Sequence, residues 1–152
     1  MSGTIVPLNL PQPDLKLARK NNQVVVWDAL RKKYLVLTPE EWVRQHLVHY
    51  LQSECGVPAS AIALESGFRL NTKLQRTDIL VYKNRQPVLL VECKAPQVKL
   101  SQETFDQAAR YNLKYKVNYL LISNGLKSIW AKVDFTVKRY EFLQDPVQFS
   151  AL

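Results

Sequence analysis

Two acidic residues and one lysine stand beside apolar stretches in the middle of the sequence. Asp78 precedes the apolar run 79–82, and Glu92 and Lys94 follow the apolar run 88–91. Two carboxylates can bind a hard divalent cation, and a nearby lysine can orient a water molecule or offset developing negative charge. This combination of residue types suits the hydrolysis of a phosphate ester.

The spacing of these residues predicts that they meet on one face of a β-hairpin. An antiparallel pairing of Tyr82 with Val88, with a polar turn between them, also places Asp78 opposite Glu92. Lys94 points to the same side as Glu92, because side chains alternate along a strand. Like charges directly opposed across a sheet are destabilising, so this arrangement favours a cation between the carboxylates.

Magnesium is the cation that we expect, with manganese as a substitute. The expected ligands are Asp78, Glu92 and the backbone carbonyl of Cys93, which leave positions for a phosphate and a water molecule. Lys94 is expected to orient that water or help to deprotonate it. The alternative is that Asp78 ends a turn while Glu92 and Lys94 form an ordinary solvated ion pair.

The same residues carry a resemblance to a known superfamily. Asp78 followed by Glu92-Cys93-Lys94 resembles the core motif of the PD-(D/E)XK nucleases, with Thr77 in the place of proline. The runs 38–45, 78–81, 91–96 and 124–126 are similar to the N-terminal nuclease domain of type I restriction enzyme R proteins, and the likeness covers roughly residues 24 to 143. The resemblance implies a metal-dependent endonuclease in which Asp78 and Glu92 are ligands and Lys94 is catalytic.

The resemblance also implies catalytic roles for residues on two helices. Gln107 and Tyr111 match a Gln-x-x-x-Tyr motif of some of these nucleases, and they lie one helical turn apart. Many members add a glutamate from the first helix, for which Glu41 is the candidate. Glu41 also suits a capping box, so Glu40 is an alternative, and Glu65 is a further one.

Periodicity predicts the elements that must position these residues. One helix begins at Thr38-Pro39 and ends near Gly56, and a second runs from about Gln102 to Lys116. The expected strands are Gln23 to Asp28, Lys33 to Leu37, Ala61 to Phe68, Thr77 to Tyr82, Val88 to Ala95, Asn118 to Ser123, Lys127 to Val133 and Lys138 to Leu143. This order predicts an α/β fold, and the resemblance implies a restriction-endonuclease-like three-layer core with a central mixed β-sheet flanked by helices.

Composition limits the domain organisation and the partners. We expect an extended N-terminal arm over residues 1–22, which contains three prolines, and a single nuclease-like domain over residues 23–152. The formal net charge of +8 favours a polyanion, and DNA is the expected partner. Arg44, Arg76, Lys99 and Arg110 are the candidates for contact with its backbone, although each of them also fits a purely solubilising role.

The cysteines and the hydropathy indicate the compartment. Cys55 and Cys93 match neither a disulfide framework nor a zinc pattern, so a cytoplasmic protein is expected. No apolar run approaches the length of a transmembrane helix, and no association with a membrane is expected.

The function expected from the sequence is therefore metal-dependent hydrolysis of DNA in a restriction-modification setting. The sequence holds no Gly-Lys-(Ser/Thr) phosphate loop, so a separate motor or specificity subunit, or a homodimer, is an expected partner. Two alternatives stay open. The chain is then either a nucleic-acid binding or assembly module that does not cut, or a structural protein whose basic charge is incidental.

Overall fold

The computed structural model describes residues 5–70 and 73–152, and only the backbone of residues 65–70 and 73–77 within them. Its strands are β1 (Leu17–Lys20), β2 (Gln23–Asp28), β3 (Lys33–Val36), β4 (Ile62–Leu70), β5 (Lys73–Lys83), β6 (Gln86–Cys93), β7 (Tyr119–Ser123), β8 (Ser128–Asp134) and β9 (Arg139–Leu143). Its helices are α1 (Pro39–Ser53), α2 (Gln102–Tyr115) and the 3₁₀ turns η1 (Ala59–Ala61) and η2 (Phe149–Ala151). No helix in these described ranges is long and apolar enough to cross a membrane.

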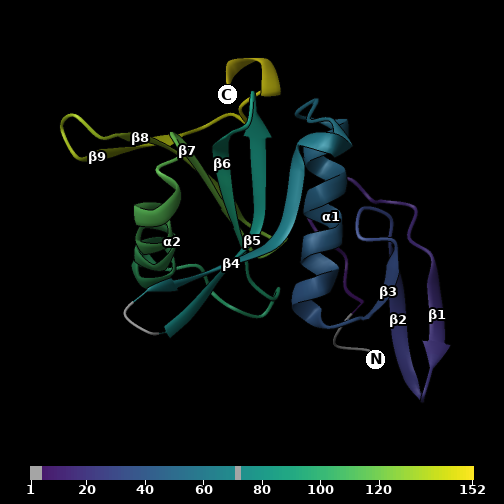
Figure 1. Cartoon of the computed structure of the whole chain (residues 1–152). Coiled ribbons are helices and arrows are strands. Elements are labelled where there is room, and N and C mark those ends of the chain that lie inside the picture. The colour runs from purple at the N-terminus through teal and green to yellow at the C-terminus, as the bar shows by residue number, and fades with distance from the viewer. Residues whose placement is uncertain (1–4, 71–72) are drawn as a thin grey trace.

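The strands form two sheets, and the larger one lies between the two helices (Figure 1). Strands β4 to β9 follow one another in chain order across the larger sheet, where β6 and β7 are parallel and all other neighbours are antiparallel. Strands β1 to β3 form a small sheet on the far side of α1 (Figure 1). The expected α/β core with a mixed sheet flanked by helices is confirmed.

Alternation along the strands builds a separate core on each face of the larger sheet. Ile79 and Val91 point to the face that α1 covers, and they pack with Leu47. Leu80 and Leu90 point to the opposite face and pack under α2. Because both faces are apolar, the central strands read as almost continuous hydrophobic runs.

Both helices begin where the sequence supplies a capping residue. Thr38 Oγ accepts a hydrogen bond from the Glu41 N–H at 3.0 Å, and Pro39 takes the first position of α1. At α2, Ser101 and Thr104 form a reciprocal capping box. The two helices predicted from periodicity are therefore confirmed to within a few residues.

The β5–β6 hairpin keeps the predicted register along its centre, where Leu80 pairs with Leu90. Beside the turn, a register shift moves Tyr82 from its predicted partner Val88 onto Pro87. The predicted register was therefore wrong beside the turn and right from Ile79 to Val81, and the ladder ends one residue before the predicted pair of Asp78 and Glu92.

The turn between β5 and β6 explains this shift. Asn84 and Arg85 have φ of 53° and 64°, and positive φ at both central residues is typical of a two-residue type I′ hairpin turn. Strand β6 therefore begins at Gln86 instead of Val88, and a bulge absorbs the extra residue.

The N-terminal residues are more structured than the expected arm. Strand β1 lies within residues 1–22 and pairs with β2. The Trp42 indole N–H donates to the Val6 carbonyl at 2.9 Å, and Leu8 packs against the same cluster on α1. The prolines predicted an extended backbone, but the apolar residues between them bind this backbone to the domain.

We expect Gly125→Ala to destabilise the protein more than Gly56→Ala. Both glycines have positive φ, 84° and 71°, which costs a residue with a Cβ roughly 1–2 kcal/mol. A Cβ at Gly125 would also lie 2.8 Å from a Leu8 methyl group, whereas a Cβ at Gly56 would meet nothing within 4 Å. Urea unfolding of the two variants measures the difference, and equal losses would contradict the packing of Leu8 on this turn.

Candidate metal and phosphate site

The candidate site lies where β5 and β6 cease to pair with each other. Their ladder runs as far as Ile79 opposite Val91. Beyond that point the Cys93 N–H donates to Asp78 Oδ2 at 2.7 Å, so its hydrogen-bond acceptor is a side chain instead of a backbone carbonyl of β5. Asp78 is only 9% exposed, so its carboxylate is buried at the point where β5 and β6 stop pairing.

Glu92 is the second carboxylate of the site, and it is more deeply buried. Its Oε1 lies 3.4 Å from Lys94 Nζ, whereas its Oε2 is buried without a hydrogen-bond partner among the described residues. Burial and the neighbouring Asp78 charge raise the pKa of Glu92 to about 8, despite the opposing effect of Lys94. The carboxyl therefore needs a proton or a further cation to be stable in this position.

Lys94 connects this strand to helix α2. Its Nζ donates to Gln107 Oε1 at 3.0 Å, and the Gln107 amide donates in turn to the Tyr111 hydroxyl at 3.3 Å. Burial, followed by the charges of Glu92 and Asp78, raises the pKa of Tyr111, so its hydroxyl stays protonated. The structure thus brings together the lysine and the Gln-x-x-x-Tyr pair that the sequence pointed to separately.

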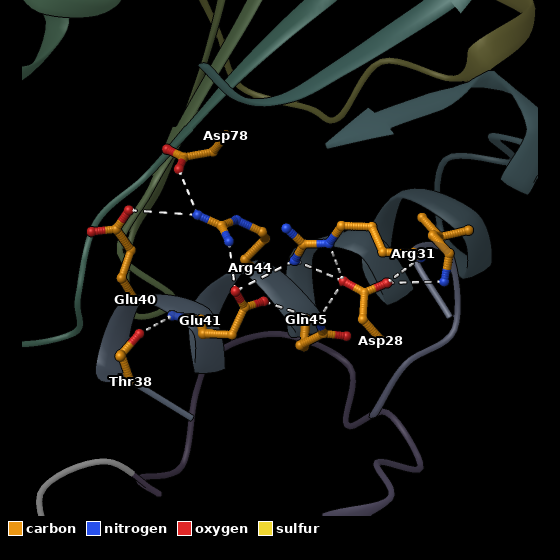
Figure 2. Close-up of polar contacts among 9 residues, drawn as sticks. Asp28, Arg31, Thr38, Glu40, Glu41, Arg44, Gln45 and Asp78 are labelled. Atoms are coloured by element: carbon orange, nitrogen blue, oxygen red, sulfur yellow. Dashed lines mark hydrogen bonds and ion pairs between the residues drawn. The ribbon is translucent and has the colours of Figure 1, made fainter. Parts of the chain in front are cut away.

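Helix α1 approaches the same carboxylates from the other side, with Arg44 as the connecting residue. The Arg44 guanidinium lies 2.9 Å from Asp78 Oδ1, 2.6 Å from Glu41 Oε1 and 3.8 Å from Glu40 Oε1 (Figure 2). Only 8% of its side chain is exposed. These contacts raise the pKa of Arg44 further above its already high ordinary value, although burial opposes them.

The two glutamates at the start of α1 have different surroundings. Glu41 is buried against Arg44 and against the Gln45 amide, which donates to its Oε2 at 2.9 Å. Glu40 is half-buried, and the pKa of Glu40 is raised by burial and then by the charge of Asp78. Glu40, the alternative candidate, is therefore the glutamate whose charge interacts with that of Asp78. The Glu41 carboxylate is instead held by Arg44 and by the Gln45 amide.

The small sheet contributes to this buried network as well. Asp28, at the end of β2, accepts hydrogen bonds from the Arg31 guanidinium at 2.8 Å and from the Gln45 amide at 3.2 Å (Figure 2). Arg31 also reaches Glu41 Oε1 at 3.5 Å. The hydrogen bonds from Arg31 and the Gln45 amide lower the pKa of Asp28, although burial, the largest influence on it, acts in the opposite direction.

The four residues expected at a DNA surface fall into three groups. Lys99 and Arg110 are exposed and line a cleft of about 350 Å³ together with Lys94 and Gln107. Arg44 is buried in ion pairs, which removes it from any surface that a phosphate backbone reaches. The side chain of Arg76 lies outside the described residues, and so does that of Glu65.

Cys93 takes a position that fits a structural residue. Its side chain belongs to the apolar core under α1, on the sheet face opposite Glu92, and complete burial raises the pKa of its thiol. Neither cysteine is part of a disulfide. Only the backbone of Cys93 faces the site, through the N–H that holds Asp78.

The donor set fits a small hard cation that keeps most of its water. Among the described residues no group of three or more His, Cys, Asp or Glu side chains is arranged to hold a metal ion. Magnesium does not require such a cage, because it is commonly bound by one or two carboxylates together with water and phosphate oxygens. The buried, unbonded Glu92 Oε2 beside Asp78 provides the uncompensated charge that a cation of this kind would neutralise.

Two features of the site were missed in the sequence, although each leaves a signal there. Arg44 follows Glu40 and Glu41 at the i+4 and i+3 spacings of helical ion pairs, so its burial among carboxylates could have been considered. Asp28 alternates with Val24 and Val26, a spacing that points an acidic residue at the buried side of its strand.

Replacing Glu92 with glutamine is expected to stabilise the metal-free protein at alkaline pH. Because folding raises the pKa of Glu92 from 4.5 to about 8, the folded state favours the protonated carboxyl. This stabilising contribution is complete below the unfolded pKa and is lost as the pH rises through the folded pKa. In EDTA, the Tm of Glu92→Gln should exceed that of the native protein at about pH 9 and approach it at about pH 5.

A matched control is Glu141→Gln, which removes an exposed carboxylate from β9 and should show no such pH-dependent gain. A native protein as stable as Glu92→Gln at about pH 9 would show that burial of this carboxylate carries no cost.

Comparison with known proteins places this chain in a family. A family model described as the type I restriction enzyme R protein N terminus matches residues 39–146. Among solved structures, the fold resembles a fragment of a protein described as an HsdR subunit of a type I restriction enzyme from Vibrio vulnificus YJ016, at 20% identity and a TM-score of 0.54. That match covers 74% of this chain and 24% of the other, so this chain spans about a quarter of its relative's length. No curated protein matches the sequence. Because the family model covers well over half of the residues, this chain belongs to the family of type I restriction enzyme R protein N-terminal domains.

Proposed function

We propose that this chain hydrolyses phosphodiester bonds of DNA with Mg²⁺, for which Mn²⁺ can substitute. Membership of its family indicates a restriction-enzyme nuclease module, and the proposal adds the chemistry. The observation that carries it is the buried Glu92 Oε2, which lacks a hydrogen-bond partner among the described residues although Asp78 and Lys94 are its neighbours. A buried carboxylate whose charge is only partly offset, here by Lys94, destabilises the fold, and this cost favours a role for it in binding a cation.

Asp78 and Glu92 would hold the metal, which when bound supplies a Lewis acid that activates water and offsets charge on the phosphate. Cys93 keeps one oxygen of Asp78 in place through its backbone N–H. Lys94 presents an ammonium group beside Glu92, where it can orient the attacking water and stabilise charge on the phosphate oxygens.

Gln107 and Tyr111 would act by keeping Lys94 in position. The hydrogen bond from Lys94 to the Gln107 amide restricts a long, flexible side chain that is otherwise only partly buried. Tyr111 fixes the Gln107 amide, because its hydroxyl accepts one of the amide hydrogens. In the proposal, Glu40 replaces Glu41 as the glutamate of the first helix, since the charge of Glu40 interacts with those of Asp78 and Glu92.

The cleft beside Lys94 is suited to the DNA backbone. Lys99 and Arg110 line it as exposed cations, and Ser101 at the N-terminus of α2 lines it as well. The positive end of a helix dipole favours phosphate, and this effect adds to that of the side-chain charges. Contacts of this type bind any sequence, so we propose low sequence specificity.

The family also suggests the partners. An R protein N terminus belongs to type I restriction systems, and we propose that DNA recognition and translocation reside in parts of the system other than this domain. A domain that binds DNA without cutting it is the second candidate. It is favoured by the ion pair between Arg44 and Asp78, which supplies a cation to one of the metal-binding carboxylates.

Replacing Lys94 with methionine should reduce the cleavage of supercoiled DNA about a hundredfold or more, because a general acid–base or charge-stabilising group typically contributes that much. The measurement is nicking in Mg²⁺ or Mn²⁺, with EDTA as the metal-free control. Lys132→Met, which removes an exposed lysine from β8, should cleave like the native protein. Cleavage that persists in EDTA, or that Lys94→Met leaves intact, would exclude this mechanism.

Removing both Lys99 and Arg110 should weaken DNA binding and its dependence on salt. Each lost phosphate contact lowers the slope of log K against log salt by about 1, so the double alanine variant should lose a slope of about 2. Binding is measured in EDTA by fluorescence anisotropy, which separates it from cleavage. The control is the double variant Lys132→Ala, Arg139→Ala, which changes the net charge by the same amount. Because these two residues line a different cleft, this variant should keep a slope near the native value.

A further inference from the structure

We propose that Arg44 is a positioning residue of the nuclease site and that the connection between β2 and β3 holds it in place. Its guanidinium serves as a resident cation among the carboxylates, fixing Asp78 and Glu40 at the cost of weaker metal binding. This inference rests on the proposed function, because it assigns Arg44 a role toward the metal held by Asp78 and Glu92.

The contacts of Arg44 leave Asp78 little freedom. Arg44 binds Asp78 Oδ1 at 2.9 Å while the Cys93 N–H binds Oδ2 at 2.7 Å, so both oxygens of the carboxylate are held. A guanidinium presents several donors in a rigid plane and can therefore bind Glu41 and Asp78 at once, which the single ammonium of lysine does less well. The carboxylate is thus oriented before a metal arrives.

The charges explain why a cation is needed at this position. Burial is the first cause of the raised pKa of Glu40 and of Glu92, and the charge of Asp78 raises the pKa of both further. Lys94 lies beside Glu92, and Arg44 lies between Glu40 and Asp78. A positive charge fixed within the site must also repel an incoming divalent cation, so orientation of the ligands and metal affinity oppose each other.

The support for Arg44 comes from outside the region that the family model matches. That match begins at residue 39, whereas Asp28 and Arg31 lie in and after strand β2 of the small sheet. Arg31 contacts Glu41, and Asp28 binds the Gln45 amide that also holds Glu41 (Figure 2). The small sheet therefore connects to Asp78 through a continuous chain of buried polar contacts.

The first test is a double-mutant cycle in EDTA, so that it does not depend on metal. Urea unfolding is compared for the native protein, Arg44→Gln, Asp78→Asn and the variant with both changes. Because each single change leaves a buried charge without one of its ionic partners, the double variant should lose less stability than the sum of the two single losses. Additive losses would overturn the proposed ion pair, whatever the protein does with metal.

The second test separates metal affinity from catalysis. Calorimetry with Mn²⁺ should show about tenfold tighter binding by Arg44→Gln than by the native protein, while its cleavage rate at saturating Mn²⁺ falls at least about tenfold. Arg44→Lys keeps the charge and loses the planar fork, so its metal affinity should stay near native while cleavage falls. Gly125→Ala provides a control for general destabilisation and should leave Mn²⁺ affinity unchanged.

The third test addresses the small sheet. Arg31→Gln should lower the cleavage rate without changing Mn²⁺ affinity, whereas Arg19→Gln, which removes an exposed arginine from β1, should change neither.

These outcomes distinguish the two proposals. If the native protein binds no Mn²⁺ and cleaves no DNA, the proposed function is wrong. The double-mutant cycle in EDTA would still decide whether Arg44 holds Asp78. Native metal binding with unchanged affinity and rate in Arg44→Gln would overturn the inference alone.

Discussion

Several carboxylates share a small, poorly solvated space where β5 and β6 stop pairing, and the surrounding elements are arranged to supply them with positive charge. Lys94 comes from the end of β6 and Arg44 from α1, so each flank of the cluster receives one cation. Buried charges of one sign are tolerated only when they are paired, and an incomplete pairing must be relieved by a proton or by a further cation. The unbonded oxygen of Glu92 marks where that pairing is incomplete.

The separation of β5 from β6 creates the space for this cluster. A continuous ladder would use the Cys93 N–H for backbone pairing, whereas here the N–H holds the Asp78 side chain. The apolar residues before this point pack on both faces of the sheet and keep the strands rigid up to the place where they part. A rigid frame under the polar ends is what allows long side chains such as Lys94 to keep a defined position.

Much of this arrangement follows from sequence patterns that act over short distances. Alternation and register placed Asp78, Glu92 and Lys94 together, and helical spacing placed Gln107 beside Tyr111. The part of the hairpin beside the turn was predicted wrongly because the positive φ of Asn84 and Arg85 was not inferred from these residue types. The spacing of Arg44 from Glu40 and Glu41 hints at their ion pairs, but the contact of Arg44 with Asp78, 34 residues away, has no local pattern in the sequence. The sequence left both Glu41 and Glu40 open as the glutamate of the first helix, and the packing of α1 brings Glu40 close enough to Asp78 for their charges to interact.

The parallel pairing of β6 with β7 has a consequence for how the site is assembled. A parallel pair requires a crossover, and here the crossover is α2, so Lys94 and Gln107 meet within one β–α–β unit and are separated by only 13 residues. The contacts of Arg44, Glu41 and Asp28 join this unit from an earlier part of the chain. One half of the site thus forms from contacts within a single short stretch of the chain. The other half forms only when segments that are distant in the sequence pack together. Changes of sequence in the N-terminal half can therefore alter the carboxylates that we propose as metal ligands while Lys94 and helix α2 stay as they are. If the proposed function holds, such changes are a short route between a domain that cuts a nucleic acid and one that only binds it.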